Sequence, residues 1–362
     1  MKYVDEYRDA ALVGRLAAAI RKAAPPERTF RLMEVCGTHT MAIGRFGLRA
    51  LLPPNVKLLS GPGCPVCVTP KEYVDHTLAL AARGDVTVAT FGDMMRVPGS
   101  RGDLQRAAAA GADVRVVYSS LEALEAAAAA RARRVVFLGV GFETTAPTVA
   151  AAVKAARARG YDNFFVLVAH KLIPPAMRVL CANERLALDG FLCPAHVSAI
   201  IGTRAYEFIP REYGRACAVA GFEPVDIMQG ILMLVTQAAA GKPTVDNAYS
   251  RVVHPDGNPR ARALLDEVFE VADSRWRGLG DLPASGLRLR GEYVAFDAAV
   301  ALPVDIPPTV PDEGCLCGDV LSGITEPGGC PLFGKVCTPE TPVGPCMVSA
   351  EGTCAAAFKY GL

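Results

Sequence analysis

Two cysteines stand three residues apart in the stretch GPGCPVCVTP, residues 61–70. A pair with this spacing can form a redox-active dithiol or supply half of a four-cysteine zinc site. The next cysteine after Cys67 is Cys181, so no second pair follows at the spacing of a zinc ribbon. We therefore predict that Cys64 and Cys67 do redox chemistry or bind a metal transiently.

The residues after Cys67 resemble the start of a helix. Thr69 fits the N-cap, Pro70 the first helical position and Glu72 the third, as in a capping box. We expect Cys67 to lie just outside this helix, where unpaired N–H groups and the helix dipole lower the pKa of a thiol.

A cysteine and a histidine, Cys36 and His39, are spaced C-x-x-H after the apolar run FRLMEV. A thiolate and an imidazole can bind iron or zinc, or can act as a nucleophile and its base. A buried histidine beside an unreactive cysteine is the alternative interpretation.

Six of the twelve cysteines lie in a Gly- and Pro-rich stretch between Cys315 and Cys354. Four thiolates in such a segment suit an iron–sulfur cluster, with zinc as the alternative metal. The four candidate ligands are Cys315, Cys330, Cys337 and Cys354. Cys317 and Cys346 remain and can form a disulfide that accepts or passes electrons.

Composition narrows the class of protein. The chain has 362 residues, of which 51% are hydrophobic and 21% charged, with 38 basic and 37 acidic residues. A globular protein with a sizeable core is expected, and nucleic acid is not expected as a partner because no basic run is present. The charged start, MKYVDEYRDA, does not resemble a secretory signal, and no segment is apolar over the length of a membrane span. We expect a cytoplasmic protein that does not enter a membrane.

Apolar runs that alternate with Ala-rich helical stretches predict an α/β fold with parallel sheets covered on both faces. We expect two consecutive α/β/α units followed by a Cys-rich iron–sulfur domain, which the C-terminal region forms together with the N-terminal segment. The expected divisions are residues 1–51 as the N-terminal segment that carries CGTH, 52–133 and 134–225 as the two α/β units, and 226–362 as the iron–sulfur domain. A long helix is expected over 259–277.

Two acidic residues also follow predicted strands, where parallel α/β units gather their ligands. Glu143 can orient the ligands of a metal or merely precede a helix cap, and Asp93 can support a site or merely form a turn.

Several long motifs in this order resemble the HypD family of nickel–iron hydrogenase maturation proteins, over essentially the whole chain. The motifs are MEVCGTHTMAI, LLSGPGCPVCVTP, TFGDMMRVPGS, GVGFETTAP and CPLFGKVCTPETPVGPCMVSAEGTCAA. The resemblance implies a scaffold for assembling the Fe(CN)2CO group before its delivery to the hydrogenase large subunit. It implies a complex with the small protein HypC, which supplies a cysteine, and with HypE, which supplies cyanide.

The resemblance also implies roles for individual residues. Iron would lie between the thiolate of HypC and Cys36, with His39 nearby or bound to it. A 4Fe-4S cluster would be held by the four candidate ligands named above, and electrons would pass through Cys317 and Cys346 to Cys64 and Cys67. Two other interpretations stay open: an iron–sulfur-dependent disulfide reductase, and a zinc-stabilised binding module.

Overall fold

Two parallel sheets form the framework of the computed structural model, which describes residues 5–361. The first sheet has the strand order β2-β1-β7-β8-β9, and the second has the order β4-β3-β5-β6. The first consists of β1 (Phe30–Glu34), β2 (Val56–Ser60), β7 (Gly190–Pro194), β8 (Ala216–Ala220) and β9 (Val245–Asn247). The second consists of β3 (Val86–Thr90), β4 (Val114–Val116), β5 (Arg134–Gly139) and β6 (Phe164–Val168). The predicted α/β class with parallel sheets is confirmed.

Helices cover the faces of both sheets. The longer ones are α1 (Ala10–Ala23), α2 (Gly37–Arg45), α4 (Lys71–Ala81), α6 (Ser120–Ala129), α7 (Ala146–Ala158), α8 (Ile173–Ala182), α11 (Pro224–Ala240) and α12 (Pro259–Val268). The central strands β3, β7 and β8 are buried at every residue because helices pack on both sides of them. None of the helices within residues 5–361 has the length and apolar character needed to cross a membrane. Residues 1–4, the beginning of the charged start, lie outside the described part of the chain.

The two sheets are not consecutive units, which corrects the prediction from the sequence. The chain makes β1 and β2, leaves to build the second sheet, and returns to pair β7 with β1. Strand pairs also cross the predicted divisions after residues 51, 133 and 225, so those divisions find no support in the pairing. Apolar runs mark the strands but do not encode which strands become neighbours.

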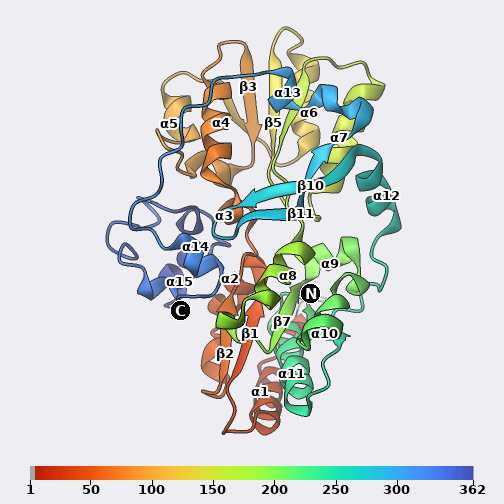
Figure 1. Cartoon of the computed structure of the whole chain (residues 1–362), viewed down its shortest axis with the longest axis vertical. Coiled ribbons are helices and arrows are strands. Elements are labelled where there is room, and N and C mark those ends of the chain that lie inside the picture. The colour runs from red at the N-terminus through yellow and green to blue at the C-terminus, as the bar shows by residue number, and fades with distance from the viewer. Residues whose placement is uncertain (1–4, 362) are drawn as a thin grey trace.

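The predicted helix over 259–277 is also wrong in its second half. Helix α12 ends at Val268, and the chain continues as β10 (Phe269–Trp276), which pairs antiparallel with β11 (Gly280–Leu289). Exposure alternates along β10, as expected for a strand with one solvated face. The hairpin lies between the two sheets (Figure 1).

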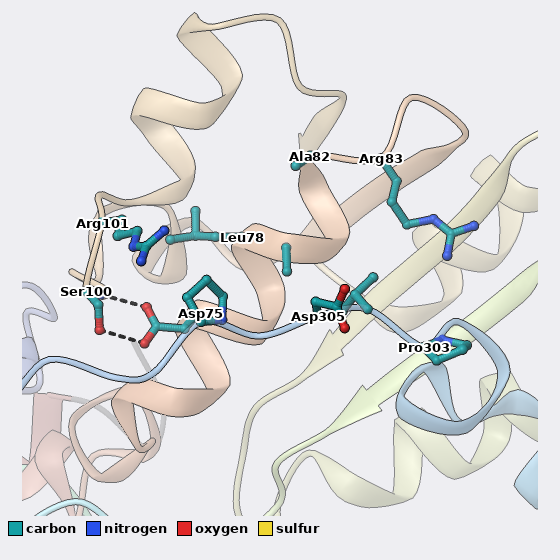
Figure 2. Close-up of a pocket in the computed structure, with 11 residues that line it drawn as sticks. Asp75, Leu78, Ala82, Arg83, Ser100, Arg101, Pro303 and Asp305 are labelled. Atoms are coloured by element: carbon teal, nitrogen blue, oxygen red, sulfur yellow. Dashed lines mark hydrogen bonds between the residues drawn. The ribbon is translucent and has the colours of Figure 1, made fainter.

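The Cys-rich segment follows a long connection. After α13 (Ala298–Ala301), residues 302–316 cross α4 without helix or strand and lead into α14 (Cys317–Leu321) and α15 (Thr353–Tyr360). The Asp75 carboxylate of α4 anchors this connection, because it accepts a hydrogen bond from Thr309 Oγ1 of the connection at 2.9 Å. The same carboxylate accepts the hydroxyl of Ser100 at 2.7 Å, which holds it in place (Figure 2 shows Ser100). The connection thereby carries the C-terminal cysteines to the first sheet (Figure 1).

Candidate functional site

Cys36 lies where β1 gives way to α2. Its carbonyl oxygen accepts hydrogen bonds from the N–H groups of His39 at 2.9 Å and Thr40 at 3.2 Å, so Cys36 is the N-cap of α2. Its side chain is buried, and burial together with the negative charge of Glu351 raises the pKa of Cys36 to about 12. The group is therefore a thiol at neutral pH and becomes a thiolate when a bound cation displaces the proton.

His39, on the first turn of α2, is fully buried and carries a free lone pair. Its Nε2 lies 3.1 Å from the carbonyl oxygen of Ala220 and 3.0 Å from that of Gly221. Both partners are acceptors, so Nε2 bears the proton and Nδ1, which has no hydrogen-bond partner, is the basic nitrogen. Burial lowers the pKa of His39 to about 4, so the ring is neutral at pH 7. A neutral imidazole fixed through its other nitrogen is the usual form of a histidine metal ligand.

The glycine-rich loop that carries Cys64 is pressed against the main chain of Cys36. The N–H of Gly37 donates to the carbonyl oxygen of Gly63 at 3.0 Å. A Cβ atom on Gly63 would lie 2.2 Å from the backbone nitrogen of Cys36, so only glycine allows this approach. The two cysteine motifs predicted from the sequence therefore share one site.

Cys64 and Cys67 form a disulfide with a Cα–Cα distance of 5.2 Å, and both side chains are buried. The helix expected after Cys67 is present as α4, which begins at Lys71 with Pro70 as its N-cap, one residue later than expected, but a second short helix precedes it. A one-turn helix, α3 (Pro65–Val68), begins directly after Cys64, whose sulfur accepts the N–H of Cys67 at 3.2 Å. Thr69 ends α3 and donates its hydroxyl to the Pro65 carbonyl oxygen at 2.8 Å, so it does not cap α4. Cys64, rather than Cys67, occupies the amino end of a helix.

The C-terminal segment closes over both motifs. Thr38 Oγ1 donates to Glu351 Oε1 at 2.6 Å, and a Cβ atom on Gly37 would lie 2.5 Å from the Glu351 carbonyl oxygen. The Cys67 sulfur lies 3.8 Å from the carbonyl oxygen of Pro345, the residue before Cys346. Sulfur-bearing segments almost three hundred residues apart in the chain are thus in direct contact, as expected from the sequence.

Asp93 belongs to this contact as well. It follows β3 of the second sheet, and its Oδ2 accepts the hydroxyl of Ser349 at 2.6 Å. Ser349 lies two residues before Glu351 in the same C-terminal segment. Asp93 therefore ties the second sheet to the segment that covers Cys36, although it is itself exposed.

The C-terminal thiols form two neighbouring groups. Cys346 lies 3.1 Å from Cys354, sulfur to sulfur, and also hydrogen-bonds with Cys317. Cys315 lies near Cys317 and Cys330, while the sulfur of Cys337 accepts the N–H of Val343 at 3.4 Å. The hydrogen bond to Cys346 and burial raise the pKa of Cys317 well above its ordinary value, and burial raises the pKa of Cys315 to about 12.

The donor set matches a thiolate-bound cluster in its chemistry. Cys330, Cys337 and Cys354 are buried, and burial raises the pKa of Cys315, the fourth predicted ligand, so that a bound cation would favour its thiolate. Within residues 5–361, however, no three Cys, His, Asp or Glu side chains lie close enough together to hold one metal ion. The assignment of Cys315, Cys330, Cys337 and Cys354 as the four ligands therefore remains a prediction.

Glu143 lies in a different environment from Cys36. It follows β5, is buried, and accepts the N–H of Ile173 at the start of α8 at 2.9 Å through Oε1. Its Oε2 has no hydrogen-bond partner. Burial raises the pKa of Glu143 to about 7. None of its hydrogen bonds reaches the CGTH or GPGC motifs, so the expected role in orienting the ligands of iron stays a prediction.

We expect the Glu143→Gln variant to lose less stability than the wild type as the pH rises. In the unfolded chain this carboxyl ionises near pH 4.5, whereas in the folded protein it keeps its proton up to about pH 7. The unfolded state therefore binds fewer protons across this window, and the free energy of unfolding falls by about 2–3 kcal/mol. Urea unfolding at pH 5 and pH 8 measures this difference; equal losses in wild type and variant would contradict it.

Two residues that touch the site were not predicted from the sequence. Glu351 bonds Thr38 and raises the pKa of Cys36, and Ser349 binds Asp93. Both lie in VSAEGTC, between Cys346 of the predicted redox pair and the predicted ligand Cys354. The signal available was a lone acidic residue in an otherwise small and apolar stretch.

Replacing Glu351 by Gln should lower the pKa of Cys36, because glutamine keeps a hydrogen-bond acceptor for Thr38 but removes the negative charge. We expect Cys36 to react with iodoacetamide about tenfold faster at a fixed pH, which corresponds to one pKa unit. The Thr38→Val variant is the control: it keeps the charge of Glu351 and removes the hydroxyl that donates to Glu351 and also stabilises the Cys36 thiolate, so it should not speed the reaction. Equal rates in wild type and Glu351→Gln would show that the charge has no effect.

Comparison with known proteins identifies the family of the chain. A family profile described as "HypD: Hydrogenase formation hypA family" matches residues 11–361. The chain is 49% identical to Hydrogenase maturation factor HypD of Rhizobium leguminosarum bv. viciae, over 100% of this chain and 96% of the relative. It is 48% identical to the protein of that name from Cupriavidus necator, over 100% of this chain and 97% of the relative. It is 46% identical to the one from Escherichia coli K12, over 99% of this chain and 98% of the relative. The chain therefore belongs to the HypD family of hydrogenase maturation factors.

Proposed function

We propose that this protein is a scaffold and redox protein on which the Fe(CN)2CO group of a nickel–iron hydrogenase is assembled. The observation that carries the proposal is the presence, in the first turn of α2, of Cys36 and of a neutral His39 whose Nδ1 has no hydrogen-bond partner. A thiolate and an imidazole are borderline to soft donors that suit low-spin iron with cyanide and carbonyl ligands. The iron group is the cargo of this site, not a resident cofactor.

Each neighbouring residue has a distinct part in the proposal. The main-chain carbonyls of Ala220 and Gly221 hold the proton of His39 on Nε2. Its Nδ1 therefore keeps a lone pair that can bind iron. Glu351 disfavours the free thiolate of Cys36, which keeps the sulfur protonated until iron arrives. Binding is therefore expected to release one proton from Cys36.

The adjacent disulfide supplies the redox half of the proposal. Release of cyanide from a carrier of the type R–S–CN takes two electrons and yields the carrier thiol and hydrogen cyanide. The reduced Cys64 and Cys67 pair provides these two electrons and two protons as its S–S bond forms, so atoms and charge balance. The contact between Gly63 and Cys36 supports cyanide release beside the iron-binding residues.

A resident 4Fe-4S cluster, held by Cys315, Cys330, Cys337 and Cys354, would supply single electrons when bound. The chain's own contribution is to bring the carbonyl oxygen of Pro345, the residue before Cys346, within 3.8 Å of the Cys67 sulfur, which supports re-reduction of the disulfide by way of Cys346. Cys317 and Cys346 are the proposed pair on that path.

The family resemblance supports two partners for the proposed assembly. HypC would supply a second thiolate to the iron beside Cys36, and HypE would deliver the cyanide carrier. The finished group would then pass to the hydrogenase large subunit. A stand-alone disulfide reductase is less well supported, since it needs only the Cys64–Cys67 pair and gives no role to Cys36 and His39 in the first turn of α2.

Iron and acid-labile sulfide analysis of the anaerobically purified full chain tests the redox half. The proposal predicts about four irons and four sulfides per chain. The Cys330→Ser variant should lose most of both, whereas Cys181→Ser, which changes a buried cysteine of α8, should keep them. Stoichiometric zinc without sulfide would contradict the proposal and favour a zinc-stabilised module.

A further inference from the structure

A cavity of about 590 Å3 lies on the side of the molecule where α8, α9 (Ala195–Ile201), α12 and the β10–β11 hairpin meet. Its walls are mostly apolar and include Leu172, Ile201 of α9, Leu265 of α12, Phe269 of β10 and Leu287 of β11. The volume is within the range of about 300–1,000 Å3 that small-molecule sites occupy, and such sites favour junctions of this kind. One buried acidic side chain, Glu143, lines this apolar space.

Glu143 differs from a carboxylate that only holds the fold together. Its Oε1 accepts one main-chain N–H, and its Oε2 is buried without a partner. Asp75, which lines a second cavity of about 600 Å3, offers the contrast, since both its oxygens accept hydrogen bonds from Ser100 (Figure 2). A buried acceptor left without a donor costs free energy, which a bound donor would recover.

A cationic ligand is favoured by the one buried carboxyl group of the lining, that of Glu143, and not by the summed charge of the cavity. Asp266 is a second acidic residue of the lining, whereas Glu270, the third, forms an ion pair with Arg288. The two arginines that line it, Arg262 and Arg290, each donate to a main-chain carbonyl oxygen, of Asp256 and Asp266 respectively. Glu143 has no ion-pair partner among the described residues.

We propose that this cavity binds a small organic cation, whose amine or amidine head donates to Glu143 and whose apolar body contacts Leu265 and Phe269. The site is separate from the iron-binding residues. Its lining includes none of the CGTH, GPGC or C-terminal cysteine residues, and the inference does not depend on the proposed scaffold function.

Benzamidine, an amidinium on an apolar ring, is the probe, and benzamide is its neutral isostere. Isothermal titration calorimetry on the full chain at pH 8, where the Glu143 carboxyl is ionised, should give a dissociation constant of about 1 mM or tighter for benzamidine, as expected for a ligand of this size. Benzamide should bind at least about tenfold more weakly, because it lacks the charge that Glu143 attracts.

Variants localise the binding. Glu143→Gln, which keeps the acceptor for the N–H of Ile173, should weaken the binding of benzamidine at least about tenfold and leave the binding of benzamide unchanged. Glu34→Gln is the matched control, because Glu34 is also a buried glutamate with an unpartnered Oε2 but does not line this cavity. Ile201→Trp should abolish binding of both compounds by filling the cavity.

The inference fails if the wild type does not bind benzamidine at millimolar concentration, or if benzamide binds equally well. It also fails if Glu143→Gln and Glu34→Gln weaken benzamidine to the same extent. If Glu143→Gln does not fold, the comparison of the two compounds on the wild type and on Ile201→Trp still decides the question.

Discussion

The Cys36→Ser variant should lose the cyanide and carbonyl infrared bands of the complex with HypC and HypE. Serine keeps the size of the side chain and its place at the N-cap of α2, but a hydroxyl is a hard donor that does not replace a thiolate on low-spin iron. Loss of a group that only hydrogen-bonds to a metal ligand lowers metal affinity or activity by about 10–100-fold. Loss of the ligand itself is therefore expected to reduce the bands by at least about 100-fold.

Cys217→Ser is the matched control for this result. Cys217 is a buried, unpaired cysteine on β8 of the same sheet, and it has no contact with the CGTH or GPGC motifs among the described hydrogen bonds. It should keep the bands once the folded fraction is taken into account. Bands of equal intensity in Cys36→Ser and the wild type would mean that Cys36 does not hold the iron.

Gly63→Ala should destabilise the protein and also impair iron loading. The added Cβ atom would lie 2.2 Å from the nitrogen and 2.4 Å from the Cα of Cys36, and backbone atoms cannot move away without shifting the loop or β1. Overpacking of this kind costs about 1–3 kcal/mol. Because the displaced atoms belong to Cys36 itself, loading should fall about 100-fold even in the folded fraction.

The single tryptophan, Trp276, is buried and reports unfolding in urea by its fluorescence. Gly14→Ala serves as the control, because Gly14 is a helical glycine of α1 with no atom within 4 Å of the added Cβ. That change should stabilise the protein by about 0.5–1 kcal/mol. If Gly63→Ala has the stability and iron content of the wild type, the loop does not press on Cys36 as described.

The strands and the residues at their ends were the most predictable part of this protein. Continuous apolar runs marked β1, β3, β5, β6 and β7 because both faces of these strands are buried. Cys36, Cys64 and Asp93 were recognised because chemistry in parallel α/β proteins gathers where strands end. Their proximity to the C-terminal segment was expected from the redox roles of the cysteines.

The pairing of strands was not predictable in the same way. Nothing in the composition of β7 indicates that it returns to β1, more than a hundred residues earlier, instead of extending the second sheet. The hairpin was missed for a different reason. FEVADSRW follows a helix directly, without a glycine or proline between them. Its strand-like alternation was therefore interpreted as a continuation of the helix.

Local details of the site depended on contacts that no short motif contains. Thr69 looked like a helix cap, but Cys64 and Pro65 already start a helix that uses Thr69 at its end. Glu351 acquires its influence on Cys36 only because α15 and the preceding turn pack on α2. Such effects follow from tertiary packing, which local propensity does not determine.

Iron K-edge X-ray absorption of the anaerobic complex, taken as the difference from the same protein before the iron group is loaded so that cluster iron cancels, tests the central claim most directly. The account predicts a sulfur shell and one imidazole nitrogen beside the carbon shell of cyanide and carbonyl, with the nitrogen lost in His39→Phe and the sulfur shell reduced in Cys36→Ser. An iron environment that is the same in all three proteins would contradict it.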